Sequence, residues 1–403
     1  MRCWACSMFL GSLVILAAAP AQAGIYNPGE SEETATYPDF INSRQGRNFR
    51  DVVIILRSIP VNQPQIDNPV RRRYVFLEEL IARSAASSFK STEERLMGSA
   101  VLIRRRKFKE AEALLRPVAT APGEQNNIPI QSNFATALHM GGDLQGAYET
   151  LRPVVRDHWK KSWGELADER RGELQRIGWS EPVYDLNRTY DTYYLKLLRL
   201  RLRERVSKKE RKEIVQLPDA LFDDQKDPPS PVRFVSEDGE FEPGKLAAAE
   251  RAKLPPEALA IVQQLIVWMP DDLRLYWLLG ELYNVQKGEG QKENREGILA
   301  ALQIFTELAN IDSVSEGARE HLRKRIGALT AAQERFEDER AQLLSKNLEK
   351  IETTSTPAFT VDWRTVGISF GLGFVLAFFA LWQIREIQRR RLARQNATKA
   401  HSV

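Results

Sequence analysis

The chain has 403 residues and a formal net charge of +4; 43% of its residues are hydrophobic and 28% are charged. At about 100–200 residues per domain, this length accommodates two or three domains or one extended array. The 8 Trp, 10 Tyr and 17 Phe exclude disorder throughout, and the charged fraction excludes a membrane protein with many spans.

The first 23 residues have the three parts of a secretory signal peptide. Arg2 gives a positive start, Met8–Ala19 is apolar, and Ala21–Ala23 has the small-x-small cleavage pattern. An apolar helix of this length is too short to span a bilayer core of about 30 Å. An uncleaved anchor or a buried helix is the alternative. Cleavage removes Cys3 and Cys6, the only cysteines, which excludes a disulfide scaffold or a cysteine-based site in the mature chain.

Residues 24–216 are predicted to form an N-terminal helical region with two repeat units. Within it, RRRKFKEAEALLRPV at 104–118 resembles HMGGDLQGAYETLRPV at 139–154, and the alignment places Ala111 over Ala147 at an offset of 36 residues. This period, with apolar residues at helical spacing, predicts stacked antiparallel helix pairs. The small alanine lets the paired helices approach closely.

The same region contains an aromatic stripe, a sequon and basic runs. The stripe lies within 185–206 and predicts a core-facing helix rather than a ligand-binding cage; it consists of Tyr190, Tyr193, Tyr194, Leu197, Leu198 and Leu202. Asn187 begins a glycosylation sequon, which matters only in a glycosylating host. The runs Arg71–Arg73 and Arg104–Lys107 are predicted to be solvated helix faces.

The second half of the chain is predicted to repeat this organisation after an interruption. Residues 217–245 contain DPPSP and EDGEFEPG, which break helices and predict a linker or a protruding loop. Residues 246–312 are expected to hold further helix pairs. Residues 313–352 predict a long polar helix that caps the array, because its apolar seam is too interrupted for a strong coiled coil. Residues 353–365 would then be a short stalk.

The C-terminus predicts a single membrane anchor. Val366–Ile384 is a stretch of 19 uncharged residues, close to the length of a spanning helix. Six basic residues and one acid follow it, so residues 385–403 are expected in the cytoplasm and the N-terminal domain outside, in a single-pass type I topology. With the basic charge concentrated there, nucleic acid is a poor ligand for the external part. Gly367 and Gly371 form a GxxxG pattern that favours homodimers, although ordinary glycine content of a membrane helix is the alternative.

One stretch of the second half carries a family resemblance. Tyr276–Tyr283, with sequence YWLLGELY, precedes a predicted second helix over Ile298–Asn310 with Ala301 and Phe305 at its small and aromatic positions. These residues resemble the tetratricopeptide repeat family, whose unit of about 34 residues is an antiparallel helix pair. The earlier units match at fewer positions, and Gln286–Glu296 is an insertion. The resemblance implies an all-α fold: a partly degenerate α-solenoid plus a long C-terminal helix and one transmembrane helix.

The resemblance also implies a partner-binding groove, lined by the first helix of each unit. The residues that fall on this face are Arg274, Trp277, Glu281 and Asn284 in the best unit and Ser132, Thr136 and His139 in an earlier one. Such a groove would bind a partner protein or peptide. The basic cluster with which some family members hold a terminal carboxylate is not reproduced.

No pattern in the sequence indicates catalysis. The four histidines are far apart and lack metal-ligand spacing, and no phosphate-binding or nucleophile-elbow motif occurs. The acidic pairs Asp223–Asp224 and Asp271–Asp272 are expected to cap or turn the chain. We therefore expect a membrane-anchored, non-enzymatic interaction scaffold without a cofactor or metal. The alternative is a structural envelope protein that self-associates through its membrane helix.

Overall fold

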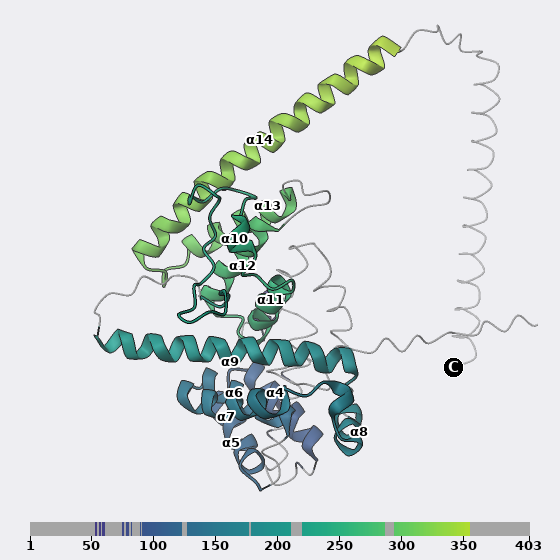
Figure 1. Ribbon diagram of the computed structural model, residues 1–403, viewed down its shortest axis with the longest axis vertical. Helices are drawn as coiled ribbons and strands as arrows, with labels where there is room; N and C mark the ends of the chain where they lie inside the picture. The colour runs from purple at the N-terminus through teal and green to yellow at the C-terminus, as the bar shows by residue number, and fades with distance from the viewer. Residues whose placement is uncertain are drawn as a thin grey trace, which may run out of the picture. The chain divides into compact units, whose positions relative to one another are not determined.

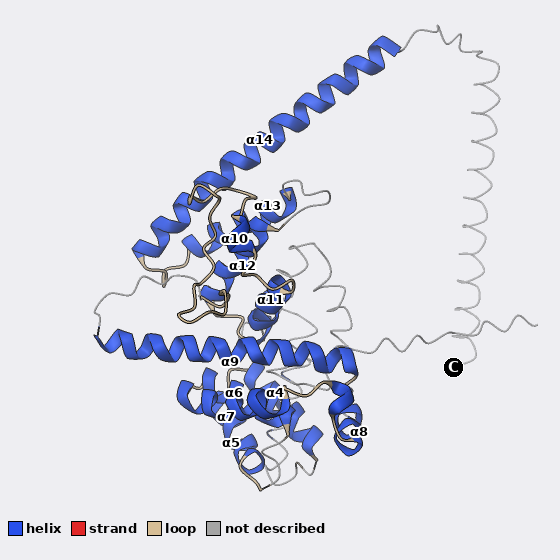
Figure 2. Cartoon of the chain, in the orientation of Figure 1, coloured by secondary structure: helices blue, strands red, loops and turns tan. Residues whose placement is uncertain are grey.

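The computed structural model describes residues 91–122, 127–176, 179–210, 220–286 and 294–354, with scattered positions between 53 and 89. Over these residues the protein is all-α, as predicted, and Figure 2 shows helices joined by loops. The helices are α4 Thr92–Arg104, α5 Phe108–Ala119, α6 Ile128–Met140, α7 Leu144–Pro153, α8 Asp168–Arg176, α9 Glu181–Glu210, α10 Ala248–Arg251, α11 Ala258–Trp268, α12 Leu273–Val285, α13 Arg295–Ala309 and α14 Glu316–Thr354, with a π-helical turn η4 at Val154–His158 and a 3₁₀ turn η5 at Trp163–Glu165.

Side-chain caps explain where several helices begin. Ser91 and Glu94 form a capping box at the start of α4, with both backbone-to-side-chain bonds at 3.1 Å. Asp143 caps α7 by accepting from the Gly146 amide, and Asp272 caps α12 by accepting from the Arg274 amide. The capping role predicted for Asp272 is thus confirmed.

The chain divides after Phe336 into two units, residues 1–336 and 337–403, and of the second unit the structure describes the last part of α14. In the first unit, α4 packs on α5 and α6, α5 on α6, and α6 on α7. Ala111 and Ala147, the two alanines aligned in the sequence, are fully buried in these contacts. Helices α4–α7 form a first group, and helices α11–α13 with the start of α14 form a second. The long helix α9 contacts α7 of the first group and α11 of the second, and it lies between the two groups in Figure 1.

The second group of helices is built on a glycine contact. α12 packs against α11 on one side and α13 on the other. A Cβ atom at Gly280 would lie 2.4 Å from Phe305 Cε1, so only glycine permits this approach of α12 to α13. The first part of α14 completes the core with Ala318, Leu322, Leu329 and Ala332, all fully or almost fully buried.

Residues 217–245 were predicted to be a linker or a protruding loop, and the described segment 220–247 has no helix but packs apolar side chains on the core. Leu221, Phe222 and Phe234 are buried, and the Val232 amide donates to the Phe222 carbonyl at 2.9 Å. Prolines and glycines do stop helix formation here, but three large apolar side chains fix the loop on the core. The loop therefore contributes to the fold.

Several sequence predictions concern residues outside the described part. These are the signal peptide 1–23, most of the stalk 353–365, the basic tail 385–403, the run Arg71–Arg73 and the segment Val366–Ile384 with Gly367 and Gly371. In the part of the chain that the structure describes, no helix is both long and apolar enough to cross a bilayer. The expectation of a transmembrane helix thus has no support in the described residues, and the segment predicted to form it lies outside them.

Candidate functional site

The predicted groove face of α6 is covered by α9. Ser132 and Thr136 are buried, and the Ser132 hydroxyl donates to Asp191 Oδ2 on α9 at 2.9 Å. His139 Nδ1 lies 3.0 Å from the Tyr194 hydroxyl of the same helix. The expectation of an open groove here is therefore wrong: a helix of the same chain lies on the face that was assigned to a partner.

Asp191 is the centre of this contact. Its Oδ2 also accepts from the indole Nε1 of Trp159 at 3.1 Å, so two neutral donors from two other segments converge on one oxygen. The side chain is completely buried, and burial raises the pKa of Asp191 to about 7 against the weaker opposite effect of the Ser132 and Trp159 hydrogen bonds. A carboxyl in this position is half protonated near neutral pH.

Buried polar atoms without a partner occur on α9 close in sequence to this carboxyl. Asp191 Oδ1 has no hydrogen-bond partner in the described structure, nor has either side-chain polar atom of Asn187, one helical turn earlier on α9. Asn187 is fully buried, so the sequon that it begins cannot be glycosylated in the folded protein. The Tyr190 hydroxyl is likewise unpaired, and burial raises its pKa to about 12. Unpaired buried polar groups are uncommon and costly, which marks this cluster as a special region of the core.

An aromatic cluster positions the Trp159 donor. The Trp159 and Trp179 rings are stacked at 6.1 Å between centroids, and Tyr184 lies 4.8 Å from Trp159. The Tyr184 hydroxyl donates to the carbonyls of His158 and Lys161 at 3.2 and 2.9 Å, which fixes the chain just after the π-helical turn η4. Single π-helical turns are often found at functional sites.

The predicted groove face of α12 is also covered. Trp277, Glu281 and Asn284 are all buried. Arg325 of α14 forms an ion pair with Glu281, and the Gly244 amide of the 220–247 loop donates to Asn284 Oδ1 at 3.0 Å. The fourth residue, Arg274, forms a bidentate pair with Glu204 of α9 at 2.6 and 2.8 Å. The loop and α14 therefore occupy the face where a partner was expected.

Arg325 is held in this position by aromatic rings as well as by charge. Its guanidinium lies 4.9 Å from the Phe241 ring centroid and 5.9 Å from that of Trp277. The Trp277 indole also donates to Glu281 Oε1 at 3.1 Å. Burial raises the pKa of Glu281, while Arg325 and the indole oppose that rise. The α12 face thus has a cation at its carboxylate, whereas the α6 face has only neutral donors.

The basic run 104–107 joins distant parts of the chain and is not a solvated face. Arg104 is buried and donates to the Val267 carbonyl of α11. Arg105 forms an ion pair with Glu78, and Arg106 forms one with Asp271 at 2.6 Å. Arg106 has a φ of 57°, the left-handed conformation with which the chain turns out of α4.

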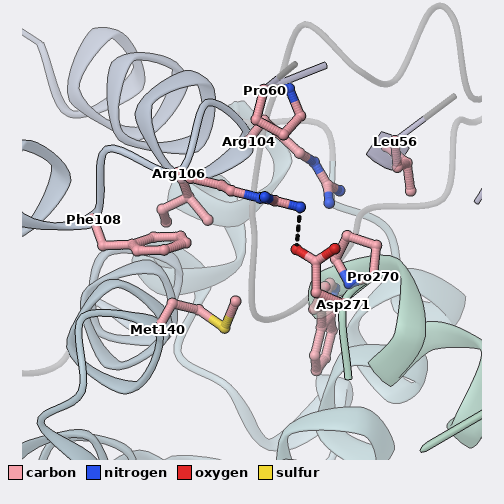
Figure 3. A pocket seen from close by; sticks show the side chains of 10 residues that line it. Leu56, Pro60, Arg104, Arg106, Phe108, Met140, Pro270 and Asp271 are labelled. Atoms are coloured by element: carbon pink, nitrogen blue, oxygen red, sulfur yellow. Dashed lines mark ion pairs between the residues drawn. The ribbon is translucent and has the colours of Figure 1, made fainter. Parts of the chain in front are cut away.

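A small cavity lies at this junction. Figure 3 shows Arg106 and Asp271 facing each other beside it, with Leu56, Phe108 and Met140 in its lining. Its volume of about 20 Å³ holds one water molecule and no larger ligand. A larger and more open hollow of about 410 Å³ lies beside the 236–251 segment.

No group in the described residues has the composition of a metal site, since no three His, Cys, Asp or Glu side chains converge there. The sequence analysis identified the tyrosines of α9 and named Asn187 only as the start of a sequon, and it passed over Asp191 between Tyr190 and Tyr193. A signal was present: Asn187, Tyr190, Asp191 and Tyr194 share one helical face, so an amide and an acid fall within the core stripe.

No protein-family model, curated protein sequence or solved structure matches the chain. The tetratricopeptide resemblance therefore has no support from a matching family. Conclusions on function depend on the geometry described above.

Proposed function

We propose that this protein is a non-enzymatic interaction scaffold, built from stacked helix pairs, that binds a partner protein. The observation that carries the proposal is the close pairing of consecutive helices through small residues: Ala111 and Ala147 among α4–α7, and Gly280 between α12 and α13. Proteins built in this way present extended surfaces instead of a single reaction centre.

We further propose that these pairs belong to a partly degenerate solenoid of the tetratricopeptide kind. Two observations support it: α4 contacts α6 as well as α5, as the first helices of successive units do, and Gly280 at the glycine position of one unit meets Phe305 at its aromatic position. The polar start of α14 then follows α13 as the capping helix would.

The partner surface in this proposal is the end of α14 and not the inner faces, which α9 and α14 cover. Leu343 and Leu344 are 62% and 55% exposed, more than any other large apolar side chain in the described residues. Leu322, Leu329, Phe336 and Leu343 recur every seven residues. The first two are buried, Phe336 is half-buried, and Leu343 is exposed.

A seven-residue repeat is the spacing of a helix that packs lengthwise on another helix. We therefore propose that an amphipathic helix of a partner protein binds to this surface. The surface consists of Leu343, Leu344 and the helical turns that carry them. The end of α14 is a short helical segment, and isolated short helices are only marginally stable in water. A partner helix would therefore also stabilise the end of α14.

Site-specific photocrosslinking tests the proposal. A photoreactive amino acid replaces Leu343 in the full chain in its native cells, and the crosslinked product is identified by mass spectrometry. A specific partner polypeptide at this position, lost on Leu344→Ser in the same chain, is the expected result. The same photoreactive residue at Leu186 of α9, which is 37% exposed, is the matched control and should not give that product.

Two outcomes would contradict this assignment. If position 343 gives no product that position 186 lacks, the end of α14 does not bind a partner. If the only product is a second copy of this chain, the structural, self-associating alternative is favoured over a scaffold for another protein.

A further inference from the structure

The contact between α9 and α6 depends on a carboxyl group that has no cation beside it. Asp191 is completely buried, and its two hydrogen bonds come from a serine hydroxyl on α6 and from the indole that follows η4. An ionised carboxylate in such a position lacks the charge partner that buried charges require. A neutral acid has no such need and can donate its own proton.

We propose that Asp191 is a pH-sensitive latch: its neutral acid form holds α9 against α6 and the segment after η4, and loss of its proton loosens this contact. The O–H bond of the acid breaks, the proton passes to solvent, and a carboxylate remains in the core. The inference is independent of the partner surface on α14.

The unpaired atoms around Asp191 fit the neutral form. Ser132 and Trp159 both donate to Oδ2, which leaves Oδ1 to carry the proton. Asn187, at the i−4 position on α9, has an unpaired and fully buried amide on the same helical face. A carboxylate would leave negative charge on an Oδ1 atom that no donor contacts, whereas the neutral acid carries no such charge.

Within the described residues, Asp191 forms hydrogen bonds with Ser132 and Trp159 but no ion pair that would compensate for a charge. From α6, His139 is kept neutral because burial and the charge of Arg201 lower its pKa to about 4. From η4, burial lowers the pKa of His158. On α9 itself, burial raises the pKa values of Tyr184 and Tyr190 to about 12 and that of Tyr194 further, so all three are neutral.

Two acids on the other packed elements act on the neighbours of Asp191: Glu257, before α11, on Tyr190, and Asp272, before α12, on His139 and Tyr194. Asp272 forms an ion pair with Arg201 of α9 at 2.5 Å, and Arg188, three residues before Asp191, forms one with Asp185 at 3.2 Å. These two arginines of α9 are thus paired with acids other than Asp191. Burial raises the pKa of Asp191 to about 7, within the range where pH changes are physiological.

The direction of the pH effect follows from linkage. The pKa of Asp191 is higher in the folded than in the unfolded chain, where it is near 3.8. Between pH 4 and pH 7 the folded state holds a proton that the unfolded state lacks. The contribution of this group to the free energy of unfolding therefore falls as the pH rises from 4 to 7, and it stays constant above pH 7. The unfolding equilibrium constant should rise about tenfold per pH unit there, relative to Asp191→Asn.

Indole fluorescence of the full chain provides the test. Because Trp159 donates to Asp191, its emission should titrate between pH 5.5 and 8.5 with a midpoint near 7. Asp191→Asn should abolish this titration, because the amide has nearly the same shape and no proton to lose. Asp157→Asn is the matched control: Asp157 lies on η4 but is exposed and paired with Arg156 at 2.6 Å, so the titration should persist.

A second measurement does not depend on any variant folding. Infrared difference spectra of the wild-type chain between pH 5.5 and 8.5 should show the loss of a protonated carboxyl band, and hydrogen exchange of the α9 amides should speed up beyond the intrinsic effect of pH. Absence of the carboxyl band from the wild type would overturn the proposal. So would a fluorescence titration that survives in Asp191→Asn, or α9 protection that stays constant across the range.

Discussion

The two groups of helices bury their inner faces in different ways. On α6 the covering helix is α9, and the contact is centred on Asp191 with neutral donors from Ser132 and Trp159. On α12 the covering element is α14, and the contact is centred on Glu281 with the guanidinium of Arg325. Both carboxyl groups are completely buried, but only the second has a cation.

This difference separates two ways of keeping an acid in a protein core. A buried ion pair keeps its charges and fails badly when one partner is lost, whereas a buried acid with neutral donors can become neutral itself. The α12 contact should therefore be sensitive to substitution, and the α6 contact to pH.

Arg325→Ala should destabilise the protein by about 3–5 kcal/mol, because it leaves Glu281 buried without a counter-charge. Urea denaturation followed by circular dichroism measures the change. Arg323→Ala is the control on the same helix: its side chain is 58% exposed and pairs only with Glu316, so the cost should stay within about 0.5 kcal/mol. Equal effects of the two variants would show that the Glu281 contact has no special role.

Gly280→Ala should cost about 1–3 kcal/mol, because its Cβ atom would lie 2.4 Å from Phe305 Cε1 and the rings and helices around it must move apart. Thermal and urea unfolding both report this. Gly327→Ala on α14 is the matched helical control, since nothing lies within 4 Å of a Cβ atom there. It should stabilise the protein by about 0.5–1 kcal/mol through helix propensity. A neutral Gly280→Ala would refute the close approach of α12 and α13.

Ser132→Ala should cost only about 1 kcal/mol, the typical value of one neutral hydrogen bond, because Trp159 still donates to Asp191. Its cost should also grow as pH rises through 7, since a hydroxyl stabilises a carboxylate more than it stabilises a neutral acid. Urea denaturation at pH 6 and pH 8 measures both effects. A loss as large as that of Arg325→Ala at both pH values would remove the distinction between the two faces.

Sequence periodicity predicted the helices but not the elements that cover their inner faces. The spacing of Ala111 and Ala147, and Gly280 with its glycine position, predicted close helix pairs that the structure contains. Trp277 and Ser132 were predicted to lie on an open face, because a repeat pattern predicts contacts between adjacent repeats and not contacts with helices that are distant in the sequence. Those contacts come from α9 and α14, which lie outside the repeat pattern.

The basic run 104–107 shows the same limit. A sequence window shows four cations next to one another and favours a solvated face, but each finds a distant acceptor. Arg104 reaches Val267, and Arg106 reaches Asp271, more than 160 positions along the chain. Pairings at such separations depend on the tertiary fold, and a local pattern carries no information about them.

The most direct test of the account is whether the chain itself covers both inner faces. Single cysteines are introduced at Thr136 on α6 and at Asn284 on α12, with Cys3 and Cys6 replaced by serine, and their modification by a maleimide is timed in the native protein. Both should react about a thousandfold more slowly than a cysteine at the exposed Glu149 of α7, the factor that a local opening of about 4 kcal/mol produces. Reaction at Thr136→Cys or Asn284→Cys as fast as at Glu149→Cys would mean that the face is open, as the sequence alone had predicted, and would contradict the account.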